Sequence, residues 1–484
     1  MIFLIGPINW SFMNLKLFAL VSFCMVCFGV TGQHKNAGAS KSGKPNIILV
    51  MADDLGYGDV GFTGNKVIKT PELDRMAANS LQFSRFYAAG PVCSPTRGSW
   101  LTGRHPERYG IFFGNEQDYL KKEELTIAEV LKTQGYTTGH FGKWHLGTLT
   151  RTLKDGRRGG RVEHNGHYAP PWEHGFDVSF TTELSVPTWD PMKNQFFVSK
   201  YWTGPDTYDH EEADGDDSRV IMDRVIPFIK KSADNDQPFL ALVWFHTPHE
   251  PVVAGDDYRK MYAEYDENKQ HYYGSITAMD EQIGRLRDEL KKLNIADNTI
   301  IFFSSDNGPA GAGGGIAQEP GKRQQGTSGI YRGRKGSLYE GGIRVPCLLE
   351  WPAMITAHRE TDVPVCSTDF YPTILTILGI KPEHQPLPID GINILPLIKG
   401  KMKDRSAALG FKSIDQRAYI ENRFKIYSPD NGQSYELYDL IADPGESKNI
   451  AHQHPKKKAA MISQLEEWIR SCENSEKGGD YTTR

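Results

Sequence analysis

The chain has 484 residues, of which 39% are hydrophobic and 24% are charged, and its formal net charge at pH 7 is −4. This length allows a large α/β domain with a smaller appendage, and the composition is that of a globular protein. Because there is no excess of positive charge to neutralise phosphates, the composition argues against a nucleic-acid-binding protein.

Residues 1–32 have the pattern of a secretory signal peptide: a lysine, then the apolar run Leu17–Val30, then small and polar residues. A helix of that run measures about 21 Å, which is too short for the ~30 Å hydrocarbon core of a bilayer. We therefore expect this segment to be removed, with Met13 as an alternative start, and the protein to be exported to the periplasm or secreted without stable membrane insertion. A lipoprotein anchor on Cys24 or Cys27 is the other reading of this segment.

Three unbroken apolar runs predict buried strands, and each run ends in polar residues. The runs are residues 45–51, 238–245 and 299–303. Apolar runs without alternation suit strands that are covered on both faces, as in a parallel sheet.

Helical patterns alternate with these runs. They cover residues 70–80, 127–135 and 276–290. A Thr-Pro-Glu start, a closing glycine and apolar residues at steps of three and four mark them as helices. The alternation predicts an α/β fold with a large, mostly parallel central sheet flanked by helices, in which ligands bind beyond the carboxyl ends of the strands.

The C-terminal part changes character. Its strand-like pieces are residues 419–420, 424–427 and 435–438. An Asp-Asn-Gly turn at residues 430–432 separates the last two, and apolar residues from Met461 to Trp468 predict a final helix. We expect a catalytic domain over residues 45–400 and a C-terminal α+β subdomain over residues 401–484, made of a smaller antiparallel sheet with one helix.

Acidic and amide side chains directly follow two of the predicted strands. Asp53 and Asp54 follow the first strand, and Asp306 and Asn307 follow the third. If these strands are parallel, three carboxylates and an amide meet at one edge of the sheet, where a cation is needed to hold them together. Oxygen ligands without His or Cys favour calcium or magnesium. Helix capping is the alternative for either pair taken alone.

The segment Cys93-Ser94-Pro95-Thr96-Arg97 places a cysteine near a predicted helix start. Pro95 suits the first helical position, so Cys93 would lie at the N-terminus of the helix, where the backbone favours anions. A catalytic cysteine and an ordinary buried cysteine both fit this pattern. Elsewhere, Cys347 and Cys366 either form a disulfide or are small buried hydrophobic residues, and we favour the second interpretation.

Several motifs together resemble those of the type I, formylglycine-dependent sulfatases of the alkaline-phosphatase-like superfamily. In the order of that family, they are Asp53–Gly56, Cys93–Arg104, Gly142–Gly147, Pro248–Pro251, Ser305–Gly308 and Lys335–Gly342. The segments Leu437–Leu440 and Asp443–Glu446 resemble the C-terminal subdomain of the same family. The resemblance therefore covers the chain from about residue 45 to 450.

The resemblance implies that a formylglycine-generating enzyme oxidises Cys93 to formylglycine (3-oxoalanine). One hydroxyl of the hydrated aldehyde would attack sulfur and leave a sulfate ester on the enzyme, and loss of a proton from the other hydroxyl would release sulfate. The resemblance also implies one bound Ca²⁺. The expected ligands are Asp53, Asp54, Cys93, Asp306 and Asn307.

The same resemblance assigns roles to five basic residues. Arg97 and Lys143 would hold the formylglycine and the metal edge in place. His145 would take the proton from the second hydroxyl. Lys335 and His249 would face the sulfate and the leaving oxygen, with His249 as the proton donor.

Two features point to a sulfated carbohydrate as substrate. Arg334 stands where many relatives have a glycine before the lysine, and it adds positive charge at the mouth of the site. The stretch from Thr148 to His210 mixes cations with tryptophans, which suits sulfated sugars, although a loop with structural aromatics fits nearly as well. Its members are Arg157, Arg158, Arg161, His164, His167, Trp172, Trp189 and Trp202. Algal ulvan, carrageenan or fucan and glycosaminoglycans are the candidate substrates.

Two other functions compete with this interpretation. A phosphatase or phosphodiesterase of the same superfamily would commonly bind two metals through several histidines. An inactive, secreted glycan-binding protein would keep Cys93 as a thiol. The residue set fits the sulfatase pattern better than either.

Overall fold

The computed structural model describes residues 43–114, 118–193, 199–311 and 323–481. The predicted signal peptide, residues 1–32, lies outside the described residues. Within those ranges, no helix combines the length and the apolar character that a membrane crossing needs.

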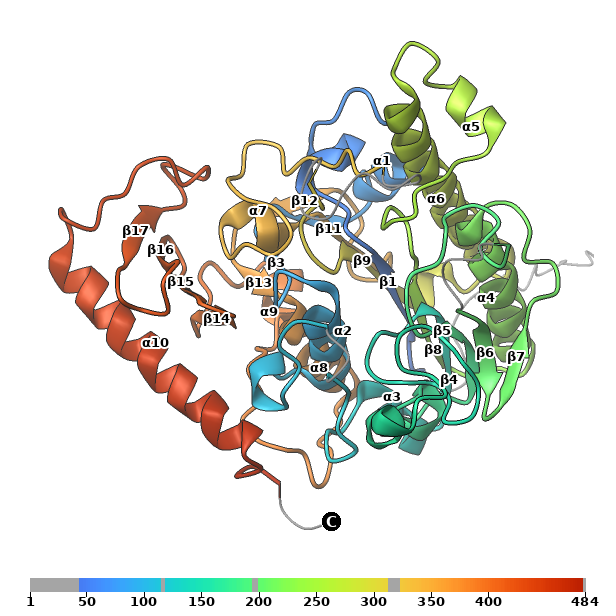
Figure 1. Cartoon of the computed structure of the whole chain (residues 1–484), viewed down its shortest axis with the longest axis horizontal. Helices are drawn as coiled ribbons and strands as arrows, with labels where there is room; N and C mark the ends of the chain where they lie inside the picture. Colours follow the sequence, from blue (N-terminus) through green and yellow to red (C-terminus); the bar gives the residue numbers. More distant parts are fainter. Residues whose placement is uncertain (1–42, 115–117, 194–198, 312–322, 482–484) are drawn as a thin grey trace, which may run out of the picture. The chain divides into compact units, whose positions relative to one another are not determined.

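A ten-stranded mixed sheet forms the centre of the protein (Figure 1). In spatial order its strands are β12 (Arg359–Thr361), β2 (Leu81–Phe83), β11 (Cys347–Glu350), β9 (Thr299–Ser305), β1 (Asn46–Ala52), β8 (Phe239–Trp244), β4 (Thr137–Lys143), β5 (Val178–Thr182), β6 (Tyr201–Gly204) and β7 (Thr207–Asp209). The five strands from β9 to β5 are parallel, whereas β11 and β6 pair with both of their neighbours in the antiparallel sense. The three strands predicted from apolar runs are β1, β8 and β9, and the mostly parallel centre is confirmed.

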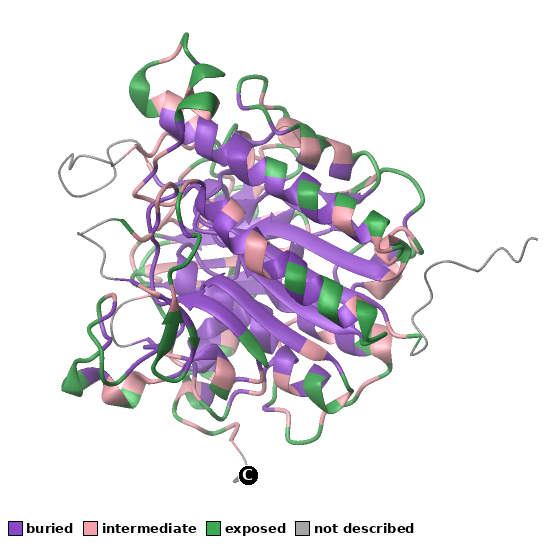
Figure 2. Ribbon diagram, turned by 90° about the vertical axis from the view of Figure 1, so that its right-hand side faces the viewer, coloured by how far each residue is buried: buried purple, intermediate pink, exposed green. Residues whose placement is uncertain are grey.

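Alternate residues of each central strand enter two separate cores, one on each face of the sheet. On β1, Ile47, Leu49 and Met51 face one core, and Ile48 and Val50 face the other. The first core is covered by α2 (Cys93–Thr102), α3 (Ile127–Thr133), α8 (Phe370–Leu378) and α9 (Leu395–Ile398). The second is covered by α1 (Pro71–Ala77), α4 (Asp217–Asp234) and α6 (Glu267–Lys292). Figure 2 shows the buried strands beneath helices whose outer faces are exposed.

Helix α6 shows why the predicted apolar stripe requires this packing. Its residues Ile276, Met279, Ile283 and Leu286 are at most 1% exposed. Full burial of each such side chain contributes about 1.5–3 kcal/mol. The short helix α5 (Asp256–Lys260) precedes α6 and has no buried residue.

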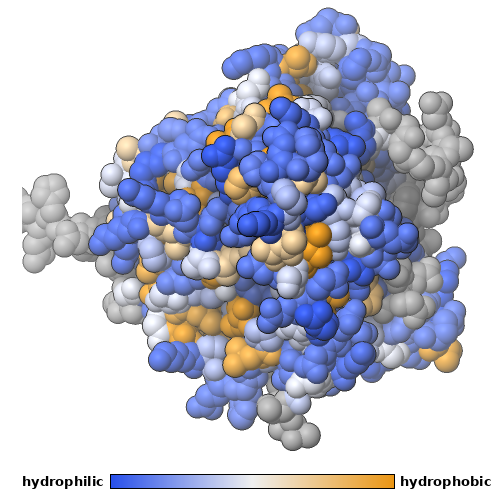
Figure 3. Space-filling view, turned by 90° about the vertical axis from the view of Figure 1, so that its left-hand side faces the viewer, coloured by the Kyte–Doolittle hydropathy of each residue, from blue (hydrophilic) through white to orange (hydrophobic). Residues whose placement is uncertain are grey.

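The C-terminal region contains the predicted small antiparallel sheet and its helix. The sheet has the order β14 (Leu409–Ser413), β15 (Gln416–Glu421), β16 (Phe424–Ser428) and β17 (Glu436–Asp439), and α10 (Pro455–Glu476) packs on it. The sequence had not predicted β14. The molecular face that carries α10 is mostly hydrophilic, with a group of apolar atoms in its lower part and smaller apolar areas elsewhere (Figure 3).

A three-stranded sheet and a short helix complete the fold. They are β10 (Arg344–Val345), β3 (Phe86–Tyr87), β13 (Val365–Cys366) and α7 (Glu340–Ile343). Cys347 and Cys366 are both buried and unpaired, so they are small hydrophobic residues and form no disulfide.

Candidate active site

The carboxyl ends of β1 and β9 bring two polar pairs into contact. Ala52 lies opposite Ser305 in the parallel register, so the residues that follow each strand are neighbours. The Asp54 N–H donates to Asp306 Oδ1 at 3.1 Å, and Asn307 Nδ2 donates to Asp54 Oδ1 at 2.7 Å. The structure therefore gathers Asp53, Asp54, Asp306 and Asn307, which are at most 2% exposed, at one edge of the sheet.

This group has the donors that a hard cation needs. One ligand atom from each of Asp53, Asp54, Cys93 and Asp306 lies within 4.8 Å of the others. In addition, Asn307 Oδ1 is buried and has no hydrogen-bond partner among the described residues. Several carboxylate oxygens and an unsatisfied amide oxygen fit calcium better than a soft metal.

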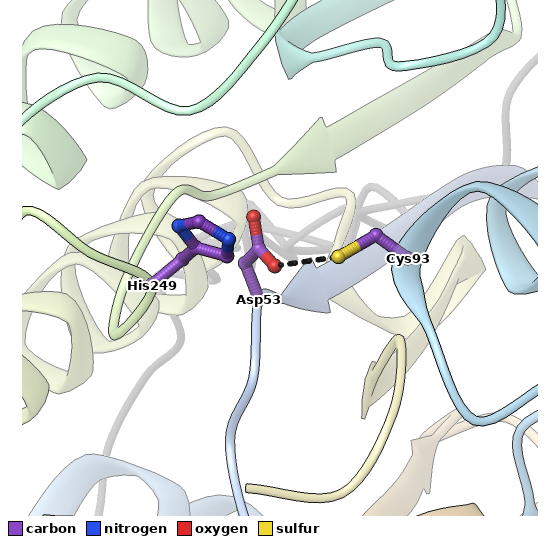
Figure 4. Close-up of side chains that lie close together, drawn as sticks. All are labelled: Asp53, Cys93 and His249. Atoms are coloured by element: carbon purple, nitrogen blue, oxygen red, sulfur yellow. Dashed lines mark hydrogen bonds between the residues drawn. The ribbon is translucent and has the colours of Figure 1, made fainter. Parts of the chain in front are cut away.

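Cys93 is the first residue of α2, and its side chain points toward Asp53 (Figure 4). Its Sγ donates to Asp53 Oδ1 at 3.4 Å and accepts from Lys335 Nζ at 3.5 Å. The helix begins two residues earlier than predicted, so Pro95 occupies the third position. A proline is still accommodated there because the first turn of a helix has no internal acceptor for its N–H groups.

Three cations neutralise the three carboxylates. Arg97, which is fully buried, donates from Nη2 to Asp306 Oδ2 at 2.7 Å. Lys143 Nζ lies 2.6 Å from Asp53 Oδ2, and Lys335 Nζ lies 2.6 Å from Asp54 Oδ1. Because these charges balance, a divalent cation bound here would leave the site with a positive charge that attracts an anionic ester.

The pKa values of the acidic groups reflect this balance. Burial opposes the ionisation of Asp53, but basic neighbours, Lys143 foremost, outweigh it and hold its pKa well below the usual range. Burial, together with the charge of Asp53, raises the pKa of Asp306 to about 6. Burial also raises the pKa of the Cys93 thiol, and the carboxylates of Asp306 and Asp53 add to the effect.

His249 lies in the turn after β8, on the opposite side of Asp53 from Cys93 (Figure 4). Its Nδ1 donates to the Glu250 carbonyl at 2.6 Å, so Nε2, which is 3.9 Å from Asp54 Oδ2, is the nitrogen that faces the carboxylates. Burial lowers the pKa of His249 to about 4, and the ring is therefore neutral at neutral pH.

His145 follows β4 in a left-handed backbone conformation, with a φ of 57°. Its N–H donates to the Glu183 carbonyl at 3.1 Å, and its own carbonyl accepts from Ser94 Oγ at 2.6 Å. Burial and the nearby charge of Lys143 lower its pKa well below the usual range. The hydrogen bonds with Glu183 and Ser94 hold the His145 backbone beside the helix that carries Cys93.

The predicted cluster of arginines and tryptophans is not one surface. Arg157 and Arg161 are exposed, but Arg158 is 2% exposed and its Nε donates to Glu183 Oε1 at 3.0 Å. Trp202 is fully buried in the first core. A substrate contact is therefore wrong for Arg158 and Trp202, whose burial fits the alternative of a loop with structural side chains.

Of the other members of that stretch, His167, Trp172 and Trp189 are partly exposed, and His164 is 5% exposed and therefore buried. Trp172 packs against the first core, and Trp189 lies against Gly255, where a Cβ would meet its ring at 2.3 Å. His164 and His167 contact each other through their Nδ1 atoms at 3.3 Å. Arg334 is exposed, as its predicted place at the mouth of the site requires.

Sequence analysis missed residues that support the site from behind. Ser185 Oγ donates to Asp53 Oδ2 at 3.3 Å, and the Glu183 carbonyl fixes His145. Both lie in the segment after β5, which carries no recognisable motif. Only its position beside β4 in the sheet brings it to the site.

Comparisons with known proteins agree with this architecture. The Sulfatase family model matches residues 45–380, and the model described as N-sulphoglucosamine sulphohydrolase, C-terminal, matches residues 326–475. Human N-acetylgalactosamine-6-sulfatase is 32% identical over 381 residues, which cover 75% of this chain and 67% of the human protein. The N-acetylgalactosamine-6-O-sulfatase of Bacteroides thetaiotaomicron is 27% identical, with 94% of this chain and 98% of that protein covered. Steryl-sulfatase of Rattus norvegicus is 29% identical over 74% of this chain and 71% of its own length.

Solved structures share the fold over most of the chain. The crystal structure of Ps i-CgsB in complex with k-i-k-neocarrahexaose is 27% identical, with a TM-score of 0.76, and the match covers 88% of this chain and 93% of that one. A phosphonate monoester hydrolase of Agrobacterium radiobacter, at 18% identity and a TM-score of 0.63, shares the fold alone, over 90% of this chain and 96% of its own. The chain therefore belongs to the sulfatase family of the alkaline-phosphatase-like superfamily, and it is a sulfuric ester hydrolase.

Proposed function

We propose that this enzyme, exported from the cell, removes sulfate from a sulfated oligosaccharide or polysaccharide of the carrageenan, fucan, ulvan or glycosaminoglycan type. The bacterial relative matched over nearly its whole length is named for a sulfated amino sugar, and the solved relative at 27% identity was crystallised with a carrageenan hexasaccharide. The steryl-sulfatases match over a smaller share of the chain.

The chemistry rests on Cys93 and the carboxylates around it. Formylglycine, made from Cys93 by a formylglycine-generating enzyme, supplies a hydrated aldehyde whose hydroxyls serve as nucleophile and as the group that lets sulfate leave. One Ca²⁺, held by Asp53, Asp54, Asp306, Asn307 and residue 93, supplies positive charge beside the reacting sulfate. The observation that carries this proposal is the position of Cys93 Sγ, within 4.8 Å of ligand atoms of all three carboxylates.

The cations of the chain stabilise the negative charge of the ester. A sulfate monoester spreads one negative charge over three oxygens, so donors on several sides lower the energy of the transition state. Lys335 Nζ, only 3.5 Å from Cys93 Sγ, reaches an ester oxygen beside residue 93. Arg97 and Lys143 are buried behind the carboxylates and position them.

The two histidines move protons on either side of residue 93. His249 presents Nε2 toward the site because Nδ1 donates to a backbone carbonyl, so the ring must first take up a proton at Nε2 before it gives that proton to the leaving oxygen. His145, held by Ser94 and Glu183, is the proton acceptor for residue 93. Its Nδ1 is buried and has no hydrogen-bond partner among the described residues, which leaves that nitrogen available.

Two measurements test the proposal. Mass spectrometry of the peptide that contains residue 93 should show the exchange of H₂S for one oxygen, and this peptide should react with aldehyde reagents. Sulfate release should be measured from defined carrageenan, fucan, ulvan and glycosaminoglycan oligosaccharides, beside an aryl sulfate and an aryl phosphate. Full turnover by protein with an unmodified Cys93 contradicts the mechanism, and release of sulfate from the aryl ester but from no glycan contradicts the substrate class.

A further inference from the structure

The segment Phe112–Gly114 lies against the wall of the active site. A Cβ atom added at Gly114 would be 2.9 Å from Ser94 Oγ and 3.5 Å from His145 Cε1. The backbone of Gly114 therefore passes close to the residue next to Cys93 and to the imidazole proposed as proton acceptor. Because consecutive Cα atoms are about 3.8 Å apart, the Cα atoms of both phenylalanines lie within about 8 Å of the Gly114 Cα.

A chain of buried polar contacts fixes this segment in place. The Asp118 carboxylate, 3% exposed, accepts the N–H groups of Phe113 at 2.9 Å and Gly114 at 2.6 Å. Arg158 Nη1 donates to the Asp118 carbonyl at 2.6 Å, and its Nε donates to the carboxylate of Glu183, whose carbonyl accepts the His145 N–H. The segment and His145 are thus held by the same support.

The two phenylalanine side chains at this position face solvent. Phe112 is 39% exposed and Phe113 is 42% exposed, and no other phenylalanine in the described part of the chain is as exposed. An aromatic side chain left in water on a rigid support is unfavourable unless something covers it. Among the described residues neither ring contacts another aromatic ring, and a sulfate ester bound at residue 93 lies next to the wall that this segment forms.

We infer that Phe112 and Phe113 form an aromatic rim that contacts the sugar ring bearing the sulfate. This inference rests on the proposed function, because it takes the alcohol to be a carbohydrate. A pyranose ring presents apolar C–H groups on its faces and hydroxyls at its edge, so an aromatic side chain packs on a face without competing for the hydroxyls. The cations hold the sulfate, and the rim selects what the sulfate is attached to.

The test compares Phe112→Ala, Phe113→Ala and the double variant with wild type on two substrates: the best sulfated oligosaccharide and a small aryl sulfate. The double variant should raise KM for the oligosaccharide at least tenfold and change its kcat less than twofold, while kcat/KM for the aryl sulfate changes less than threefold. Phe113→Trp should keep a KM near that of wild type. Tyr208→Ala, which removes a ring with a similar exposure of 41% on β7, should leave the kinetic constants for both substrates unchanged.

The outcomes separate the rim from the proposed function. If wild type desulfates the oligosaccharide and the double variant keeps its KM within twofold, the rim is wrong and the function stands. Equal losses on both substrates also overturn the rim, because they indicate that the segment only supports His145. If wild type turns over aryl or steryl sulfates and no glycan, the proposed substrate class fails and the sugar contact fails with it.

Discussion

Arg97 and Asp306 form a fully buried ion pair in which Nη2 donates to Oδ2 at 2.7 Å. Burial opposes the charge of Arg97, but Asp306 and Asp53 outweigh it and raise the pKa of the guanidinium. Nη1 of the same side chain donates to the Lys143 carbonyl at 2.8 Å. One side chain thus joins α2, β4 and the end of β9.

Arg97→Ala should lower the free energy of unfolding by about 3–5 kcal/mol, because it leaves buried carboxylates without their partner. Thermal or chemical denaturation measures the loss. Arg97→Lys keeps the charge but loses the second donor, so it should fall between the alanine variant and wild type. A stability of Arg97→Ala close to that of wild type would show that the pair contributes little.

Purified protein should contain about one Ca²⁺ per chain, which elemental analysis measures directly. Added Ca²⁺ should raise the melting temperature of chelated protein, since a ligand that binds only the folded state stabilises it. Asp54→Ala should lose both the ion and activity while it keeps its fold. The absence of any bound divalent ion, together with activity that is insensitive to chelators, would contradict the site.

Cys93→Ala should abolish turnover and still bind the sulfated substrate, because Lys335 and His249 remain. Each molecule of the Cys93→Ser variant should react at most once and stay sulfated, since a serine cannot release sulfate by regenerating an aldehyde. Burst kinetics and a binding titration distinguish the two. Multiple turnovers by either variant would overturn the role of residue 93.

The effects of replacing Arg334 and Arg158 should depend differently on salt. Arg334 is exposed, so Arg334→Ala should weaken the binding of a polyanionic substrate by about tenfold at low salt and much less at high salt. Arg158 is buried on Glu183, so Arg158→Met should destabilise the fold and reduce activity on every substrate at any salt concentration. Arg157→Ala, an exposed neighbour, is the matched control. Equal salt dependence of all three would contradict this division.

His105 should make the protein less stable in acid. Burial is the main cause that lowers its pKa from 6.5 to about 4 in the folded protein, although Asp390 opposes the shift. As the pH falls, His105 takes up a proton in the unfolded chain before it does so in the folded protein. The contribution of His105 to the free energy of unfolding is therefore complete above about pH 6.5 and is lost as the pH falls toward 4. The loss amounts to about 3 kcal/mol.

Urea denaturation of wild type and His105→Gln between pH 4 and pH 7.5 measures this contribution. The ring of His105 contacts the rings of Trp468 and Phe411, at centroid distances of 4.7 and 6.2 Å, so the variant should be less stable at pH 7. Its stability should also vary less with pH than that of wild type. The same pH slope in both proteins would assign the acid sensitivity to other groups.

The sequence allowed prediction of the strands that are apolar throughout, but not of β4. This strand, Thr-Thr-Gly-His-Phe-Gly-Lys, has two glycines and a histidine in place of an apolar run. Gly142 is required by close packing, since a Cβ there would lie 2.0 Å from the Trp244 carbonyl oxygen; one at Gly139 would lie 2.6 Å from the ring of Phe141 and 3.1 Å from that of Phe228. The contacts with Trp244 and Phe228 join residues about 90–100 positions apart, and the local pattern does not reveal them.

In the candidate site, too, some residues could be predicted from the local sequence pattern and others could not. Strand-end position predicted where Asp53, Asp54, Asp306 and Asn307 meet, because parallel register alone brings them together. Lys143, His145 and Lys335 came only from the family resemblance, since nothing in their local pattern marks them. Arg158 was misread as a surface cation because burial depends on the segments around residues 118 and 183, which are distant in sequence.

The pairing of β1 with β9 also determines when, during synthesis, the site around Cys93 can form. About 200 residues separate Cys93 from Asp306, so a ribosome takes roughly 10–40 s to pass from one to the other. Throughout that interval the strand that completes the carboxylate cluster has not been synthesised, and residue 93 lies on an open chain. Once β9 joins the sheet, Cys93 is only 4% exposed. If Cys93 is converted to formylglycine as proposed, the modifying enzyme must act before β9 joins the sheet, and variants that fold faster around β1 should carry less formylglycine.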